Sequence, residues 1–140
     1  MSLNVYLFFD GNCREVFEFY RSVFGGEFAM IQTFGDGPPG MNVPDSEKDR
    51  IMHVSLPVGS TVLMGSDSTS AFGPAPVAGD NFAISIDGES REHCDEIFAK
   101  LSEGGTIKMP MEETFWGDYF GTWVDRFGIN WMVSYQLSKE

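Results

Sequence analysis

Three acidic side chains lie beside the most aromatic part of the chain, where they could take part in proton transfer. Glu112 and Glu113 precede residues 115–132, a segment that contains Asp118 and all three tryptophans. A carboxylate held against tryptophan in an apolar pocket has a raised pKa and can act as a general base, which makes Asp118 the best catalytic candidate. Because Gly117 precedes it, Asp118 also fits a residue that caps a turn, and this structural role is favoured. Glu112 and Glu113 are expected to face solvent.

The cysteines and histidines are the other side chains that could do chemistry. Cys13 is expected at a helix start, where the dipole and Arg14 favour a thiolate, but an unreactive turn residue is the favoured interpretation. Cys94 is expected in the core. His53 fits a hydrogen-bonded strand histidine, and His93 fits a solvated helix face. The chain has no His-x-His and no His-Glu-x-x-His pattern, so no metal-binding motif is evident.

Length and charge limit the classes of protein to which this chain can belong. With 140 residues and 15.6 kDa, it can form one domain or two small modules that share a core. A net charge of -12 repels nucleic acid and anionic lipid, so neither is an expected partner. No apolar run approaches the ~20 residues that span a bilayer, and no basic segment opens the N-terminus. We therefore expect a cytoplasmic protein.

The chain contains an internal repeat with an offset of 77 residues. Three dipeptides recur in the same order, the last two residues later than strict register: Asp10-Gly11 and Asp87-Gly88, Arg14-Glu15 and Arg91-Glu92, Gly25-Gly26 and Gly104-Gly105. Each first pair follows a strand-like run, and each last pair follows a segment with helical spacing of apolar residues. The pattern indicates duplication of one structural unit.

Each copy of the repeat is expected to contain a strand, a helix and three further strands. The three strands after each helix are predicted within residues 28–34, 50–57 and 61–66, and within 106–111, 119–125 and 129–137. Residues 65–81 are rich in Ser, Gly and Pro, and residues 71–80 within this stretch fit a linker between modules at 1–70 and 81–140. The expected fold class is α+β, with two β-α-β-β-β modules whose curved mixed sheets surround an open barrel-like cleft.

This repeated unit resembles the vicinal oxygen chelate superfamily, which includes glyoxalase I, extradiol dioxygenases, and bleomycin and fosfomycin resistance proteins. Residues 6–28, YLFFDGNCREVFEFYRSVFGGEF, and 114–133, TFWGDYFGTWVDRFGINWMV, look like its PhnB-like branch. The resemblance implies a glyoxalase-like fold and a homodimer whose cavities are built from one chain or both. Members are often labelled as a ubiquinone methyltransferase, but no Gly-rich loop of Rossmann type is present here.

Metal-using relatives hold their ion with four side chains, usually His, Glu or Gln, from the first and fourth strands of each module. The resemblance places Asn4, Met64, Asn81 and Met132 at these positions, with Val5 or Tyr6 as alternatives to Asn4. Thioethers are too soft for hard or borderline divalent ions, and neutral amides cannot balance an ion's charge. The expected site therefore has no metal and no cofactor, and the two methionines make it apolar.

Aromatic side chains are expected to complete the cavity. Strand alternation sends half of residues 115–132 into the core, and Trp116, Tyr119 and Trp123 are predicted to border a hollow together with Met132. Such walls suit a small organic ligand, so the leading prediction is a metal-free small-molecule-binding protein. The alternative is a lyase, isomerase or dioxygenase-like enzyme that holds a metal through residues such as His53, or a metal-free catalyst that uses Asp118.

Overall fold

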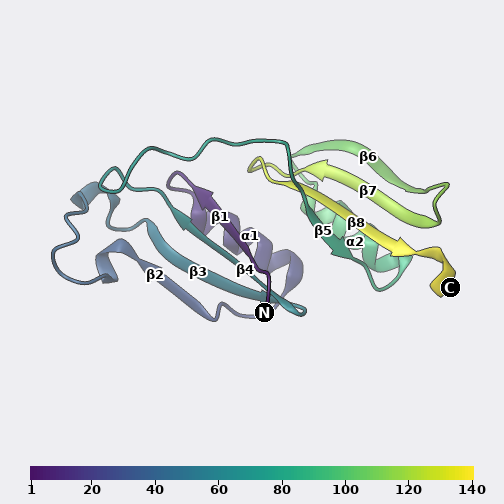
Figure 1. Ribbon diagram of the computed structural model, residues 1–140, viewed down its shortest axis with the longest axis horizontal. Coiled ribbons are helices and arrows are strands. Elements are labelled where there is room, and N and C mark those ends of the chain that lie inside the picture. The colour runs from purple at the N-terminus through teal and green to yellow at the C-terminus, as the bar shows by residue number, and fades with distance from the viewer. The chain divides into compact units, whose positions relative to one another are not determined.

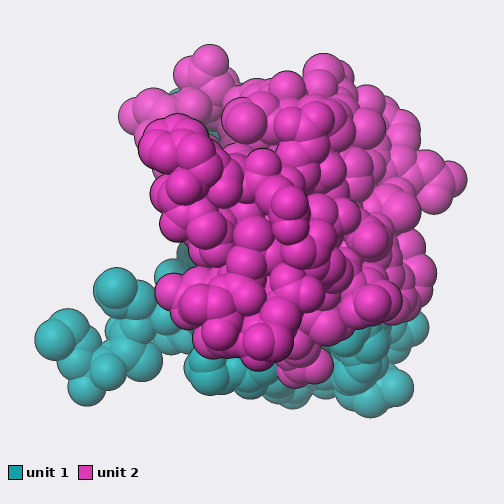
Figure 2. Space-filling view, turned by 90° about the vertical axis from the view of Figure 1, so that its right-hand side faces the viewer, with its two compact units in different colours: residues 1–77 teal, residues 78–140 magenta.

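Each half of the chain forms a four-stranded sheet with one helix on it, in a computed structural model that describes residues 1–140 (Figure 1). Residues 1–77 and residues 78–140 form two compact units (Figure 2). The order strand, helix and three strands occurs in both units, so the predicted α+β class and the predicted β-α-β-β-β modules are confirmed. Neither helix is long and apolar enough to cross a membrane.

The first unit contains a mixed sheet with the strand order β1-β4-β3-β2. β1 and β4 are parallel, whereas the other neighbours are antiparallel. Short 3₁₀ turns occupy part of the long connection between β2 and β3. The elements are β1 (Val5–Phe9), α1 (Cys13–Phe24), β2 (Met30–Thr33), β3 (Ile51–Val58) and β4 (Thr61–Asp67).

The second unit repeats this topology with the strand order β5-β8-β7-β6. β5 is parallel to β8, and the other pairs are antiparallel. The pairing of β5 with β8 begins at Ile84. The elements are β5 (Ile84–Asp87), α2 (Arg91–Leu101), β6 (Thr106–Glu113), β7 (Asp118–Val124) and β8 (Asn130–Gln136).

Both helices form because their apolar residues recur on one stripe. The buried residues of α1 are Cys13, Val16, Phe17 and Tyr20, which follow the i, i+3, i+4, i+7 spacing of a helix that packs on a sheet. α1 ends at Gly25, which has a φ of 80°. α2 begins after Ser90, whose hydroxyl accepts a hydrogen bond from the backbone N–H of His93.

The core of each unit lies between its helix and one face of its sheet. In β1, Leu7 and Phe9 are buried while Tyr6 and Phe8 are 38% and 61% exposed, as strand alternation requires. A Cβ at Gly65 in β4 would lie 2.6 Å from the Phe17 ring, so α1 packs directly on this strand. We call the face turned away from the helix the open face of each sheet.

Candidate functional site

The open face of the first sheet carries no Asp, Glu, Lys or Arg. Its members follow from the strand registers and from alternation, since directly paired residues share a face. In a chain with 21% charged residues, ten uncharged neighbours on one sheet face form a distinct apolar surface. We call this set the first open face: Tyr6, Phe8, Met30, Gln32, His53, Ser55, Pro57, Val62, Met64 and Ser66.

Three aromatic rings lie together on the first open face. The Tyr6 ring centroid is 5.1 Å from that of Phe8 and 5.7 Å from that of His53, with which it is stacked at 29°. The Tyr6 hydroxyl and His53 Nδ1 are 3.1 Å apart and hydrogen-bonded. The sequence-based expectation of a hydrogen-bonded strand histidine is therefore confirmed. The rings leave a partly exposed aromatic surface that a planar molecule can contact.

The open face of the second sheet is more polar. Met132 is paired with Ser85 in β5 and with Thr122 in β7, and Phe120 is paired with Ser134. We call these five residues the second open face. Carboxylates share this side of the sheet, because alternation places Asp118 on the same face as Phe120 and Thr122. The second sheet therefore presents an apolar centre with acidic side chains near it.

Trp116 and Asp118 lie together in the turn between β6 and β7. The Trp116 indole N–H donates a 3.0 Å hydrogen bond to Asp118 Oδ2, and the ring packs edge-on against Phe120. The backbone of Asp118 exchanges hydrogen bonds with Thr114 across the turn. This arrangement fits the turn-stabilising role for Asp118. Trp116 is 52% exposed and extends the apolar surface beside the second open face.

Tyr119 and Trp123 do not lie where the sequence-based prediction placed them. Both project from the face of β7 that packs against α2. The Tyr119 hydroxyl donates a 2.6 Å hydrogen bond to Asp95, and the fully buried Trp123 packs edge-on against Phe98 at 5.3 Å. Asp95 and Phe98 both belong to α2. The structure thus corrects both assignments, because a side chain in this core cannot border a hollow on the opposite face.

The pH behaviour of Tyr119 tests this correction. Its hydrogen bond to the Asp95 carboxylate, together with burial, raises the pKa of Tyr119 from 10.0 to about 12. Because the pKa of Tyr119 is raised in the folded state, the hydrogen bond to Asp95 stabilises the folded protein fully below pH 10.0. This stabilisation is lost as the pH rises towards 12. We expect ultraviolet absorbance to show a tyrosine step near pH 12 that Tyr119→Phe removes. If Tyr119→Phe instead removes a tyrosine step near pH 10.0, in protein that circular dichroism shows to be folded, the position of Tyr119 against α2 is contradicted.

The four residues that the resemblance places at metal positions are poor metal ligands. The Asn4 amide oxygen accepts a 3.2 Å hydrogen bond from the Val62 N–H, so it ties the chain to the start of β4. Asn81 is exposed and precedes β5. Met64 and Met132 project from the open faces but offer only thioether sulfur, a poor ligand for hard divalent ions. Residues 1–140 contain no group of three His, Cys, Asp or Glu side chains that could hold a metal.

Met64 and Met132 do not occupy equivalent positions in their two sheets. Asp87, the counterpart of Asp10, is level with Ser134, so Met132 is level with Ser85. In the first sheet, the counterpart of Ser85 is Phe8, which pairs with Ser66 and not with Met64. Met64 therefore lies one pleat away from the position equivalent to Met132.

Of the three first-strand alternatives, Tyr6 is the one that projects from the open face, because Asn4 precedes the strand and Val5 shares the face of the buried Leu7.

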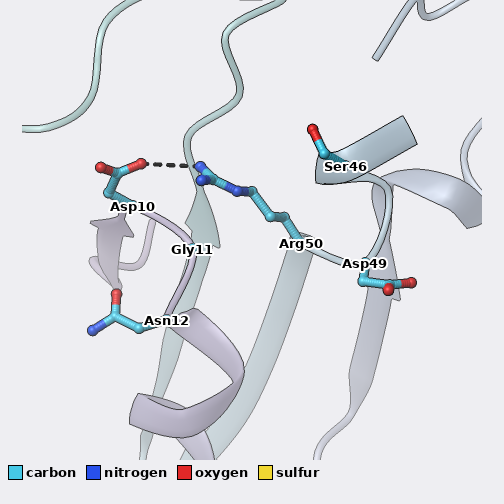
Figure 3. A pocket seen from close by; sticks show the side chains of 6 residues that line it. All are labelled: Asp10, Gly11, Asn12, Ser46, Asp49 and Arg50. Atoms are coloured by element: carbon cyan, nitrogen blue, oxygen red, sulfur yellow. Dashed lines mark hydrogen bonds and ion pairs between the residues drawn. The ribbon is translucent and has the colours of Figure 1, made fainter. Parts of the chain in front are cut away.

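A polar depression that the sequence did not predict lies at the N-terminal end of α1 (Figure 3). It has a volume of about 510 Å³ and is lined by Asp10, Gly11, Asn12, Ser46, Asp49 and Arg50. Arg50 is already paired, because its guanidinium donates to Asp10 Oδ1 at 2.9 Å and to the Ser68 carbonyl at 3.0 Å. With two carboxylates and one neutralised cation, the depression disfavours anions.

Both cysteines are poor nucleophiles. Cys13 is fully buried, and desolvation raises the pKa of its thiol, with the Asp67 carboxylate adding to the effect. Burial likewise raises the pKa of Cys94, whose sulfur packs against Gly88. The expectation of a packed Cys94 is confirmed, and the burial of the Cys13 thiol agrees with the expected unreactive residue. His93 has a structural role as well, since its Nδ1 accepts a hydrogen bond from the Glu89 N–H at the start of α2.

Comparisons with known proteins agree with this architecture. A family model described as 3-demethylubiquinone-9 3-methyltransferase matches residues 2–134. Protein YjdN of Escherichia coli is 31% identical over 145 residues, which cover 96% of this chain and 95% of YjdN. A crystal structure of a Pseudomonas aeruginosa protein is 39% identical, covers 96% of this chain and 98% of that chain, and has a TM-score of 0.80.

Two more distant solved structures support the fold alone. A Bacillus cereus protein, described as a putative 3-demethylubiquinone-9 3-methyltransferase and PhnB protein, is 23% identical with a TM-score of 0.77. It covers 96% of this chain and 99% of its own. A glyoxalase/bleomycin resistance protein/dioxygenase family enzyme from Burkholderia phytofirmans is 17% identical, with a TM-score of 0.63 and coverage of 96% and 97%.

Proposed function

The chain belongs to the 3-demethylubiquinone-9 3-methyltransferase family, a PhnB-like branch of the glyoxalase/bleomycin resistance/dioxygenase superfamily. From this premise we propose that it binds a small organic molecule without a metal. The observation that carries this proposal is the first open face, where seven other uncharged residues accompany the rings of Tyr6, Phe8 and His53. Apolar surfaces with a few polar groups are typical of small-molecule sites.

The second open face is a separate candidate surface in this proposal. Met132 and the neighbouring Trp116 offer apolar area there. Met64 belongs to the first open face, and Asn4 and Asn81 are retained as proposed ligand-binding residues. Tyr119 and Trp123 are excluded from that set because they pack on α2. The nearby Asp118 bonds the Trp116 indole, which supports a structural role over a catalytic one.

The superfamily alternative, a metal-dependent lyase, isomerase or dioxygenase-like enzyme, receives less support. His53 is the residue on the first open face best suited to bind a metal, but its nearest polar partner is the Tyr6 hydroxyl. Stable sites for divalent metals need several His, Cys or carboxylate ligands, and the open faces do not bring such a group together. The chemistry of the donor set therefore favours the binding proposal.

We extend the proposal to a cytoplasmic homodimer. Two buried, unpaired cysteines suit a reducing compartment. Exposed apolar side chains such as Phe115 and Trp116 offer surface for self-association. Native mass spectrometry of freshly purified protein is the direct test, because it reports the dimer, any stoichiometric metal and any retained small molecule together. Stoichiometric metal that is lost in His53→Ala would overturn the metal-free proposal.

A charge placed on the first open face should abolish most ligand binding. Met64→Asp puts a carboxylate beside Tyr6 on a surface without a partner for it, so we expect at least ~10-fold weaker binding of the retained molecule or of a hit from an aromatic metabolite screen. Calorimetric titration measures the effect. Ala99→Asp adds the same charge on the exposed side of α2 and should leave binding unchanged. Equal affinity of both variants would place the ligand elsewhere.

A further inference from the structure

The Tyr6–His53 pair provides the hydrogen-bonding group of the first open face. Both side chains can donate or accept a hydrogen bond, on a surface that otherwise holds thioethers, hydroxyls, an amide and hydrocarbon. A phenolic hydroxyl is a better donor than a neutral imidazole N–H, and an unprotonated imidazole nitrogen is a good acceptor. The 3.1 Å contact is therefore a hydrogen bond from the Tyr6 hydroxyl to His53 Nδ1.

This hydrogen bond fixes the position of the imidazole proton. When Nδ1 accepts from Tyr6, the neutral ring carries its hydrogen on Nε2. The interactions of His53 are the hydrogen bond and the stack with Tyr6, and neither engages Nε2. His53 is only partly buried and its one hydrogen bond uses Nδ1, so its Nε2–H is available as a donor.

The charges around this donor limit what it can bind. A cationic ligand would find no carboxylate on the first open face, and an anionic ligand would find no Lys or Arg there and would meet a chain with a net charge of -12. A neutral ligand is the remaining class. The near-parallel Tyr6 and His53 rings favour a flat molecule that stacks on them, and Met30 and Met64 offer polarizable sulfur beside it.

From this geometry we propose that the first open face selects neutral planar aromatic carbonyl compounds, with His53 Nε2–H donating a hydrogen bond to the carbonyl oxygen. The inference rests on the proposed function and adds a ligand class to it. Tyr6 acts as a positioning residue, because its hydroxyl holds the imidazole in the tautomer that donates. His53 determines specificity, because an aromatic hydrocarbon of the same shape gains the stack but not the hydrogen bond.

A matched pair of probes tests the proposal. 2-Acetylnaphthalene and 2-ethylnaphthalene have similar shape, and only the first carries an acceptor oxygen. We expect calorimetric titration of the full chain to show about fivefold tighter binding of the ketone, as one hydrogen bond to a donor predicts. His53→Phe keeps an aromatic ring and should bind both probes equally. Ala99→Asp, a control on the exposed side of α2, should keep the preference for the ketone.

Each outcome separates this inference from the proposed function. Equal affinities in the wild-type protein, or a ketone preference that survives in His53→Phe, would overturn the carbonyl inference and leave the binding function standing. Binding of neither probe, to protein that native mass spectrometry shows to be free of retained ligand, would overturn both. The nitrogen NMR shifts of the His53 ring give a readout without ligand. We expect the ring hydrogen on Nε2, and Tyr6→Phe should weaken this preference. A ring that carries its hydrogen on Nδ1 would overturn the inference.

Discussion

Replacing Asp67 with asparagine should destabilise the first unit by about 3 kcal/mol, because it weakens hydrogen bonds to a buried carboxylate and turns one of its two acceptor oxygens into a donor. Asp67 Oδ1 accepts from the backbone N–H groups of Gly11 at 2.8 Å and Cys13 at 2.9 Å, and Oδ2 accepts from the N–H of Ile51 at 2.8 Å. The side chain is only 4% exposed, so water cannot replace these partners freely. In Asp67→Asn, one oxygen becomes an NH₂ group that meets an N–H donor.

Urea denaturation followed by circular dichroism measures this loss as the change in the free energy of unfolding. Asp10→Asn is the matched control, since Asp10 lies at the same turn but its carboxylate is 59% exposed and pairs with Arg50 at the surface. Exposed ion pairs contribute little, so we expect this control to cost below about 1 kcal/mol. If the two variants lose similar stability, the buried carboxylate does not organise the turn between β1 and α1.

The role of Asp67 shows where sequence reasoning fails in this fold. The residue ends a strand that was predicted from its apolar run, and nothing in that run distinguishes it from an exposed terminal aspartate. Its three partners come from the β1–α1 turn and from β3, segments that only the tertiary structure brings together. In contrast, the apolar spacing of α1 is local, and for that reason the helix could be predicted from sequence.

The candidate site was predictable in part for the same reason. Alternation correctly separates the two faces of β7, but the strand has aromatic side chains on both, so the pattern does not identify the face that packs on α2. Tyr119 and Trp123 were therefore assigned to the wrong face. The aromatic cluster on β1 and β3 was missed, because Tyr6 and His53 are separated by 47 residues and meet only across the sheet.

The two Gly-Gly pairs occupy corresponding places in the repeat, but their glycines are required for different physical reasons. Gly25 and Gly26 have φ values of 80° and 82° and open space around them, so they are needed for backbone conformation alone. In the second unit, Gly104 also has a positive φ of 76°, but Gly105 does not. A Cβ at Gly105 would lie 2.1 Å from the backbone oxygen of Val124 and 2.9 Å from the backbone of Asp125, which is a steric requirement.

Gly105→Ala should therefore destabilise the second unit by about 3 kcal/mol, near the upper end of the usual cost of overpacking, because the obstacle is the backbone of β7. A flexible side chain could move aside, but the Val124 carbonyl belongs to the strand that pairs with β6. Gly26→Ala, the counterpart in the first unit, should cost only about 1 kcal/mol, since it meets conformational strain without a clash. Thermal and urea unfolding of both variants measure the difference. Equal losses would show that the two glycine pairs act alike and would contradict the steric requirement at Gly105.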